Sequence, residues 1–191
     1  MRRKRAKEKI VVAISGPPAV GSTSVAKAVA KRLWLPLLVV GRLQKKLVST
    51  KNESMAALLS WRTKYGSDRK AHIARDMMQV ERAKKGNVVI CSKLAIHFLK
   101  DITQYKVWLT APLAVRARRA AQRDGTDVNE TFKEISERER IERREWKRIY
   151  GFDYFYQRKI ADLVVDSSNL TLKQTVDKIV RFVKSKKSRD D

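Results

Sequence analysis

Short apolar runs alternate along this chain with longer stretches in which apolar residues recur every three or four positions. The second kind of spacing, as at Ala26, Val29 and Ala30, is typical of a helix with one buried face. The apolar runs are rich in β-branched residues and predict five buried strands, at residues 10–15, 37–40, 87–90, 105–109 and 161–166. Strands that alternate with helices predict an α/β fold with three layers, in which helices cover both faces of a parallel five-stranded sheet.

Three sequence signals predict where the later helices begin. Pro112 stands where a proline in the first turn opens a helix that runs through Arg123. Asp127 and Glu130 have the spacing of a capping box, which predicts a long charged helix from there to about residue 150. Thr171 and the glutamine three residues later predict the start of the last helix.

The chain is predicted to form one domain, residues 10–183, between a basic N-terminal tail (1–9) and a basic C-terminal tail (184–191), both expected to be flexible. Residues 42–85 have a polar, helical pattern with a break at 66–68. Apolar runs fall well short of the ~20 residues that cross a bilayer, so we expect no membrane contact. The single Cys91 favours a reducing compartment, and we expect a cytoplasmic protein.

Charge changes this picture, because 44 lysines and arginines face 20 acidic residues and leave a net charge of +24. The tails carry only part of that excess, so the folded body is itself basic. A hydrophobic content of 43% excludes a disordered basic arm. A thermophilic surface is the ordinary alternative, but such surfaces usually balance lysine with glutamate. The excess therefore favours a polyanionic partner, above all a nucleic acid.

The segment Gly16–Thr23 lies between the first strand and the first helix and has the glycine spacing of a phosphate-binding loop. In such a loop, backbone N–H groups surround a phosphate at the N-terminus of a helix. Thr23 occupies the Mg²⁺ position, whereas Ser22 replaces the lysine that normally contacts the β- and γ-phosphates. The candidate nucleotide-binding residues are Gly16, Gly21, Ser22 and Thr23. The alternative is a strand–turn–helix corner that binds nothing.

Beyond this loop, the chain resembles the archaeal-type cytidylate kinases, a family of P-loop nucleoside monophosphate kinases. The resemblance implies transfer of the γ-phosphoryl group of ATP to CMP or dCMP, with ATP and Mg²⁺ as cofactors and a helical lid at about residues 116–150. It is carried by residues 15–33 (SGPPAVGSTSVAKAVAKRL), 81–90, 107–125 (VWLTAPLAVRARRAAQRDG), 137–153 (ERERIERREWKRIYGFD) and 162–168. By position, the candidate catalytic arginines of the lid are Arg116, Arg119, Arg123, Arg138 and Arg143.

Several family positions are altered, and the changes gather at the expected site. Lys45 and Lys93 stand where the family has arginines that handle the monophosphate, which leaves them as the candidate substrate-binding residues. His72 and Ile73 replace an Asp-Arg pair, and the acidic run after Asp153 has become basic and aromatic. These losses favour a kinase fold that survives with little or no catalysis.

The favoured hypothesis is therefore a catalytically impaired protein that binds RNA within a ribonucleoprotein such as the ribosome, with ribosomal RNA and ribosomal proteins as partners. The aromatic rings of residues 150–156 either stack on bases or pack the end of the long helix. The alternative hypothesis is an active CMP/dCMP kinase. The candidate RNA-binding residues are Arg2, Arg3, Lys4, Arg5, Lys147, Arg148, Arg158, Lys159, Lys186 and Lys187.

Overall fold

The fold was obtained as a computed structural model, which describes residues 9–41, 53–61, 63 and 68–190. Five parallel strands form one sheet in the order β2-β3-β1-β4-β5, so the first strand lies at the centre. Register places Val12 opposite Val89 on one side and opposite Tyr105 on the other. The strands are β1 (Val11–Ser15), β2 (Leu37–Val39), β3 (Val88–Cys91), β4 (Tyr105–Thr110) and β5 (Leu163–Asp166).

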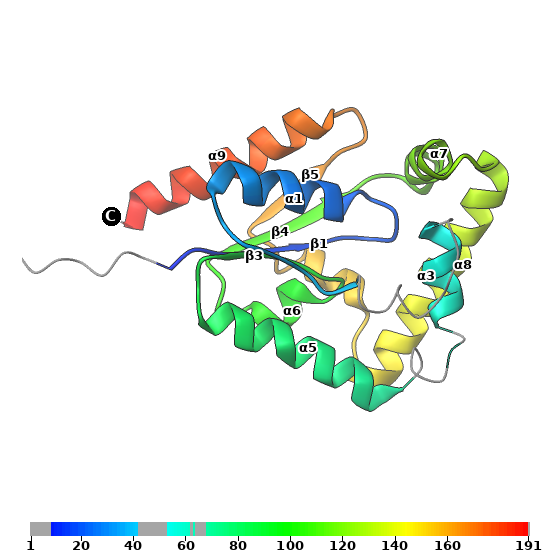
Figure 1. Cartoon of the computed structure of the whole chain (residues 1–191), viewed down its shortest axis with the longest axis horizontal. Coiled ribbons are helices and arrows are strands. Elements are labelled where there is room, and N and C mark those ends of the chain that lie inside the picture. Colours follow the sequence, from blue (N-terminus) through cyan, green and yellow to red (C-terminus); the bar gives the residue numbers. More distant parts are fainter. Residues whose placement is uncertain (1–8, 42–52, 62, 64–67, 191) are drawn as a thin grey trace, which may run out of the picture.

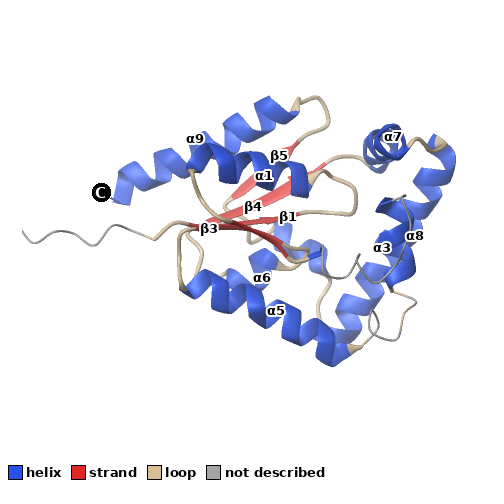
Figure 2. Cartoon of the chain, viewed as in Figure 1, coloured by secondary structure: helices blue, strands red, loops and turns tan. Residues whose placement is uncertain are grey.

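Helices cover both faces of this sheet, which confirms the predicted three-layer α/β class (Figures 1 and 2). On one face lie α1 (Ser22–Leu33) and α9 (Leu172–Asp190), and on the other lie α5 (Arg69–Lys84) and α6 (Ala95–Leu99). A separate group stands beyond the carboxyl ends of the strands and is formed by α3 (Glu53–Ser60), α7 (Leu113–Asp124) and α8 (Val128–Tyr150). A short 3-10 helix, η1 (Tyr154–Arg158), leads from α8 into β5.

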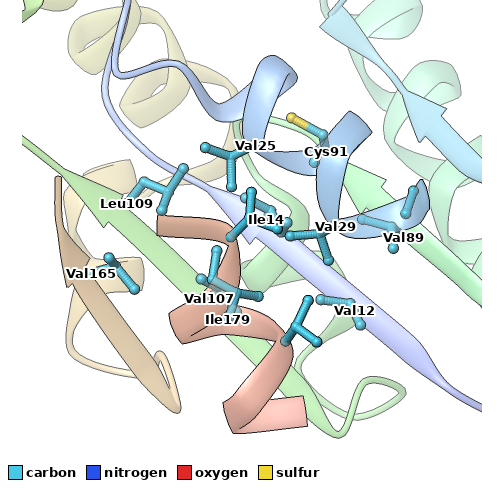
Figure 3. Packing of buried hydrophobic residues seen from close by; sticks show 14 of the residues in the cluster. Val12, Ile14, Val25, Val29, Val89, Cys91, Val107, Leu109, Val165 and Ile179 are labelled. Atoms are coloured by element: carbon cyan, nitrogen blue, oxygen red, sulfur yellow. The ribbon is translucent and has the colours of Figure 1, made fainter. Parts of the chain in front are cut away.

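Alternation along the central strand supplies both halves of the core. Val12 and Ile14 face α1 and α9, where they pack with Val29 and Ile179 (Figure 3). Val11 and Ala13 face the opposite side and join the cluster under α5 and α6. The edge strands are less buried than predicted, because each has a neighbour on one side alone: Leu37–Val39 are half-buried and Val164 is exposed.

The predicted helix starts are close to the observed ones. The Asp127 carboxylate accepts hydrogen bonds from the backbone N–H groups of Asn129 (2.8 Å) and Glu130 (2.9 Å), and so caps α8. Thr171 and Gln174 cap α9 reciprocally. Pro112 is the N-cap of α7 rather than a member of its first turn, a shift of one residue.

The C-terminal segment differs from the expected flexible tail, because α9 continues as a helix through Asp190. Lys186 Nζ donates to the carbonyl oxygen of Gln104 at 2.8 Å and lies 3.5 Å from the carboxylate of Asp162, which ties this turn to the sheet. The predicted break at 66–68 lies largely outside the described residues, although Asp68 caps α5 through the N–H of Lys70. Among the described residues, no helix has both the length and the apolar composition of a membrane span.

Candidate phosphate-transfer site

The loop between β1 and α1 has the backbone of a phosphate cradle. A Cβ on Gly16 would lie 2.7 Å from the carbonyl oxygen of Leu109, so that only glycine fits against β4. Ala19 (φ 59°) and Gly21 (φ 88°) adopt left-handed conformations that turn the chain back toward the helix. Gly21 is the N-cap of α1 and brings no capping side chain, so the first N–H groups of this helix are left for an anion. Ser22 and Thr23 form its first turn and are half-buried.

Lys93 reaches this loop from the segment that follows β3. Its Nζ lies 3.0 Å from the carbonyl oxygen of Gly16 and 5.5 Å from the centroid of the Tyr154 ring. Its own carbonyl oxygen accepts a 2.9 Å hydrogen bond from Gln157 Nε2, which fixes the backbone from which the side chain extends. An ammonium group therefore lies at the first glycine of a loop that has no lysine of its own.

Two arginines and two glutamates of α7 and α8 meet Lys93 beside the loop, and we call these five residues the loop cluster. Glu142 Oε2 lies 3.2 Å from Lys93 Nζ, and Arg138 Nε donates to Glu142 Oε1 at 2.7 Å. Arg116 Nη2 lies 2.8 Å from Glu139 Oε2, while its Nη1 donates to the carbonyl oxygen of Pro18 at 2.8 Å. Three cations are thus held at the loop by two carboxylates, which leaves the cluster one positive charge in excess.

Burial and pairing shift the proton affinities within the loop cluster. Burial lowers the pKa of Lys93 to about 8, and the neighbouring Glu142 carboxylate limits that fall. Burial tends to raise the pKa of Glu142, but Arg138 and Lys93 outweigh it and hold the pKa below its ordinary value. Near neutral pH both groups are therefore charged and paired.

The other candidate arginines lie elsewhere on α7 and α8. Arg119 donates to the carbonyl oxygens of Ser167 (2.7 Å) and Ser168 (3.1 Å), at the end of β5. Arg123 pairs with the adjacent Asp124. Arg143 pairs with Asp153 and lies over the ring of Phe155. Of the five predicted arginines, Arg116 and Arg138 therefore belong to the loop cluster. Lys45, a candidate substrate-binding residue, lies outside the described residues.

A second group of polar side chains is buried between α5 and α8, and we call it the α5–α8 cluster. Arg75 Nη2 lies 2.7 Å from His72 Nδ1, and the ring of His72 stacks on Trp61 with centroids 4.9 Å apart. Asp76 accepts hydrogen bonds from Gln79 Nε2 (2.8 Å) and from the Tyr150 hydroxyl. The cluster consists of His72, Arg75, Asp76, Gln79, Trp146 and Tyr150.

Sequence reasoning missed this cluster, and noted His72 only as part of an altered motif. The sequence did contain a signal for this cluster, namely polar residues with helical spacing. Counted from His72, Arg75, Asp76 and Gln79 follow after three, four and seven positions, which places all four on one face of a helix. Gln79 Oε1 and Trp146 Nε1 are buried and have no hydrogen-bond partner among the described residues. One unpaired acceptor and one unpaired donor are the hydrogen-bonding capacity that a buried ligand uses.

The buried carboxyl group of Asp76 should make the free energy of unfolding depend on pH. Burial raises the pKa of its carboxyl group from 3.8 to about 6, against the lowering effect of the Tyr150 hydrogen bond. Since the folded chain keeps this proton where the unfolded chain loses it, stability falls as the pH rises from about 4 to 6, by about 3 kcal/mol. Asp76→Asn should remove this step in urea denaturation, whereas the exposed Asp101→Asn should keep it. A step of unchanged size in Asp76→Asn contradicts the assignment.

Four of the basic residues expected to contact RNA lie at the surface, near the end of α8 and in or just after η1. Lys147, Arg148, Arg158 and Lys159 are exposed, and Arg148 pairs with Glu145 at 2.8 Å. The adjacent rings mostly pack: Tyr154 is fully buried, and Tyr150, Phe152 and Phe155 pack in the same core, while Tyr156 is exposed. Lys186 is bound to the sheet as described above. Arg2, Arg3, Lys4, Arg5 and the side chain of Lys187 lie outside the described residues.

The amino-acid sequence of this chain is similar to a known protein family and to proteins of two archaea. Residues 11–169 match the model of the cytidylate kinase-like family. The cytidylate kinase of Pyrobaculum arsenaticum is 35% identical over 173 residues, which is 91% of this chain and 92% of that protein. The cytidylate kinase of Ignicoccus hospitalis is also 35% identical over 173 residues, 91% of this chain and 98% of its own length.

Solved structures agree on the fold. An uncharacterized protein from Eubacterium ventriosum superimposes with a TM-score of 0.68 at 16% identity, and covers 93% of this chain and 99% of its own. The shikimate kinase from Acinetobacter baumannii, in complex with shikimate, superimposes with a TM-score of 0.60 at 16% identity over 94% of this chain and 95% of its own. At such identities the likeness is one of fold alone.

These matches correct the functional interpretation of the sequence. The hypothesis of an impaired, RNA-binding component of a ribosome is wrong, and so is the leaning against an enzyme. Relatives that align over 85–91% of the chain are named for a kinase activity, and nothing in the matches points to RNA or the ribosome. The altered positions had been given too much weight, since the phosphate loop and a group of cations beside it are present. With its matched region, its phosphate loop and its sheet order, the chain belongs to the cytidylate kinase-like family.

Proposed function

We propose that this protein transfers the γ-phosphoryl group of ATP to CMP or dCMP. The observation that carries the proposal is the uncapped N-terminus of α1 behind the Gly16–Gly21 turn, in a chain of the cytidylate kinase-like family. Relatives named cytidylate kinase, at 30–35% identity, support the same reaction.

In this reaction a phosphate oxygen of CMP attacks the γ-phosphorus of ATP, the bond to the β–γ bridging oxygen breaks, and ADP leaves. Catalysis of phosphoryl transfer rests on positioning and on neutralising the charge of the phosphates. The N–H groups at the start of α1 would hold the β-phosphate, and Arg116 and Arg138 would offset negative charge from the lid side.

Magnesium fits as part of the substrate, MgATP. Among the described residues, there is no group of three or more His, Cys, Asp or Glu side chains that could hold a metal ion. Thr23, in the first turn of α1, offers one hydroxyl oxygen, and Mg²⁺ commonly combines few protein ligands with nucleotide phosphates and water. The ion would help to neutralise the phosphate oxygens, and Thr23 would orient it.

The α5–α8 cluster supports a pyrimidine with an amino group as the acceptor base. Gln79 Oε1 is an unpaired acceptor and Trp146 Nε1 an unpaired donor, within the described residues. Cytosine presents the N4 amino group as a donor and O2 and N3 as acceptors. Uracil presents an acceptor at position 4 and a donor at N3, the reverse of cytosine, so groups placed to pair with cytosine would be mismatched, which is costly in a buried site.

Product analysis tests the proposal. The protein is incubated with ATP, Mg²⁺ and one monophosphate, and the nucleotides are separated by anion-exchange chromatography. We expect CDP and ADP in equal amounts from CMP, dCDP from dCMP, and at least about tenfold less product from UMP, the size of effect that one unpaired buried group produces. ADP without CDP, or equal use of UMP and AMP, contradicts the proposed reaction.

A further inference from the structure

We propose that Lys93 supplies the positive charge for the donor phosphates that the loop itself lacks at Ser22. This inference rests on the proposed function, since it concerns the same loop. A lysine that belongs to another strand would thus do the work of the missing loop lysine, reaching the phosphates from the end of β3 instead of the start of α1.

The first support is position. Lys93 Nζ lies 3.0 Å from the carbonyl oxygen of Gly16, the first glycine of the donor loop. Gly16 and Ser22 are the two ends of the turn that would enclose a phosphate, so a group bound at Gly16 is beside that phosphate. Ser22 has a short, uncharged side chain and cannot supply this charge.

The second support is rigidity of the base from which Lys93 extends. Gln157 is fully buried and its Nε2 donates to the carbonyl oxygens of both Lys93 and Tyr154, each at 2.9 Å. Gln157 Oε1 accepts from the backbone N–H of His97 at 3.0 Å. Gln157 thereby fixes the backbone at Lys93 to η1 and to the start of α6.

The third support is the set of partners that hold the Lys93 ammonium group. A lysine ammonium group has three donors and Lys93, with 18% of its side chain exposed, faces Gly16 O and Glu142 as its polar partners. Glu142 has a second partner in Arg138, at 2.7 Å. If Lys93 turns from Glu142 to a phosphate, Glu142 stays paired with Arg138, so that no buried carboxylate is left alone.

The resemblance had suggested a different role for Lys93, contact with the monophosphate of the acceptor. The two roles predict different effects of a lysine at position 22. If Lys93 serves the donor, a lysine in the loop compensates for its loss. If Lys93 instead binds the acceptor, a lysine at position 22 does not restore the activity that is lost when Lys93 is replaced.

The test is a rescue experiment. The starting variant is Lys93→Met, in which Glu142 keeps its ion pair with Arg138 at 2.7 Å. Two further variants add Ser22→Lys, or Ser22→Met as a control of similar length without charge. The exposed Lys100→Met is a control for loss of a lysine elsewhere. For each, we measure the Kd for MgATP by calorimetry and the kcat and KM for ATP and CMP; circular dichroism reports folding.

We expect the starting variant to lose about 100-fold in kcat/KM for ATP, the effect of removing one charged donor from a developing charge. Ser22→Lys should restore at least about tenfold of it and tighten ATP binding, whereas Ser22→Met should restore neither. Lys100→Met alone should keep the wild-type kcat/KM and Kd for ATP. The inference is overturned if KM for CMP rises alone, if Ser22→Lys restores nothing in a folded variant, or if ATP binding is the same with and without Lys93. The Kd comparison needs no acceptor, so it decides the inference even if CMP is not the substrate.

Discussion

Replacing Arg116 by alanine should destabilise the folded chain by about 3 kcal/mol and remove most of the phosphoryl transfer. Arg116 is 5% exposed and satisfies three separate groups: the carbonyl oxygens of Ala111 (3.0 Å) and Pro18 (2.8 Å) and the carboxylate of Glu139 (2.8 Å). Loss of one partner of a buried ion pair typically costs about 3–5 kcal/mol, because the other charge remains buried. Glu139 is partly exposed, which places the expected cost at the lower end.

Arg116 also joins α7 and α8 to the phosphate loop, so its removal should affect activity beyond its effect on stability. Urea denaturation gives the change in unfolding free energy, and kcat is measured where the variant is fully folded. Arg118→Ala is the matched control, since Arg118 lies two residues away on the same helix and is exposed; its effect should stay within about 0.5 kcal/mol. Arg116→Lys should recover part of the stability, because lysine keeps the charge but loses the planar set of donors. An Arg116→Ala variant as stable as Arg118→Ala contradicts this account.

The second large effect is expected for Gly16→Ala. The added Cβ would lie 2.7 Å from the carbonyl oxygen of Leu109 and 2.9 Å from Val20 Cγ1. The first is a backbone atom of β4, so the loop must move away from the sheet. Overpacking of this kind costs about 1–3 kcal/mol, and a displacement of about 1 Å at a site of reaction costs about 100-fold in rate.

MgATP binding and kcat therefore both decrease in Gly16→Ala, with binding measured by calorimetry. Gly41→Ala is the control, because a Cβ there would meet no atom of the described residues within 4 Å. We expect Gly41→Ala to retain wild-type affinity. If Gly16→Ala binds MgATP as tightly as the wild type does, the loop does not hold the phosphates in the way described.

The parts of the site that are contiguous in sequence could be predicted, and the parts assembled across the fold could not. The phosphate loop occupies eight successive residues, and its place between a strand and a helix follows from local hydrophobic spacing. The loop cluster instead joins Lys93, after β3, to Arg116 in α7 and Glu142 in α8. Its members come together only when the sheet order brings β3 and β4 to either side of β1.

The charge of the chain misled the functional interpretation for a related physical reason. Net charge is a property of composition, and it predicts attraction to polyanions without distinguishing a nucleic acid from a nucleotide site. Many of the basic residues are paired within the fold, as Arg138 is with Glu142 and Arg119 is with the carbonyl oxygens after β5. The altered motif positions were taken together as a loss of catalysis, although Lys93 keeps a positive charge beside the loop.

The central claim is that the site still transfers phosphate, and the turnover number of the wild-type protein tests it most directly. Purified protein is given saturating ATP, Mg²⁺ and CMP, and ADP release is followed by a coupled assay, with Gly16→Ala as the matched inactive control. The account predicts a kcat in the range of about 1–100 s⁻¹, as in other phosphoryl-transfer enzymes. A rate for the wild type that equals the Gly16→Ala rate, in protein shown by calorimetry to bind MgATP, would contradict it.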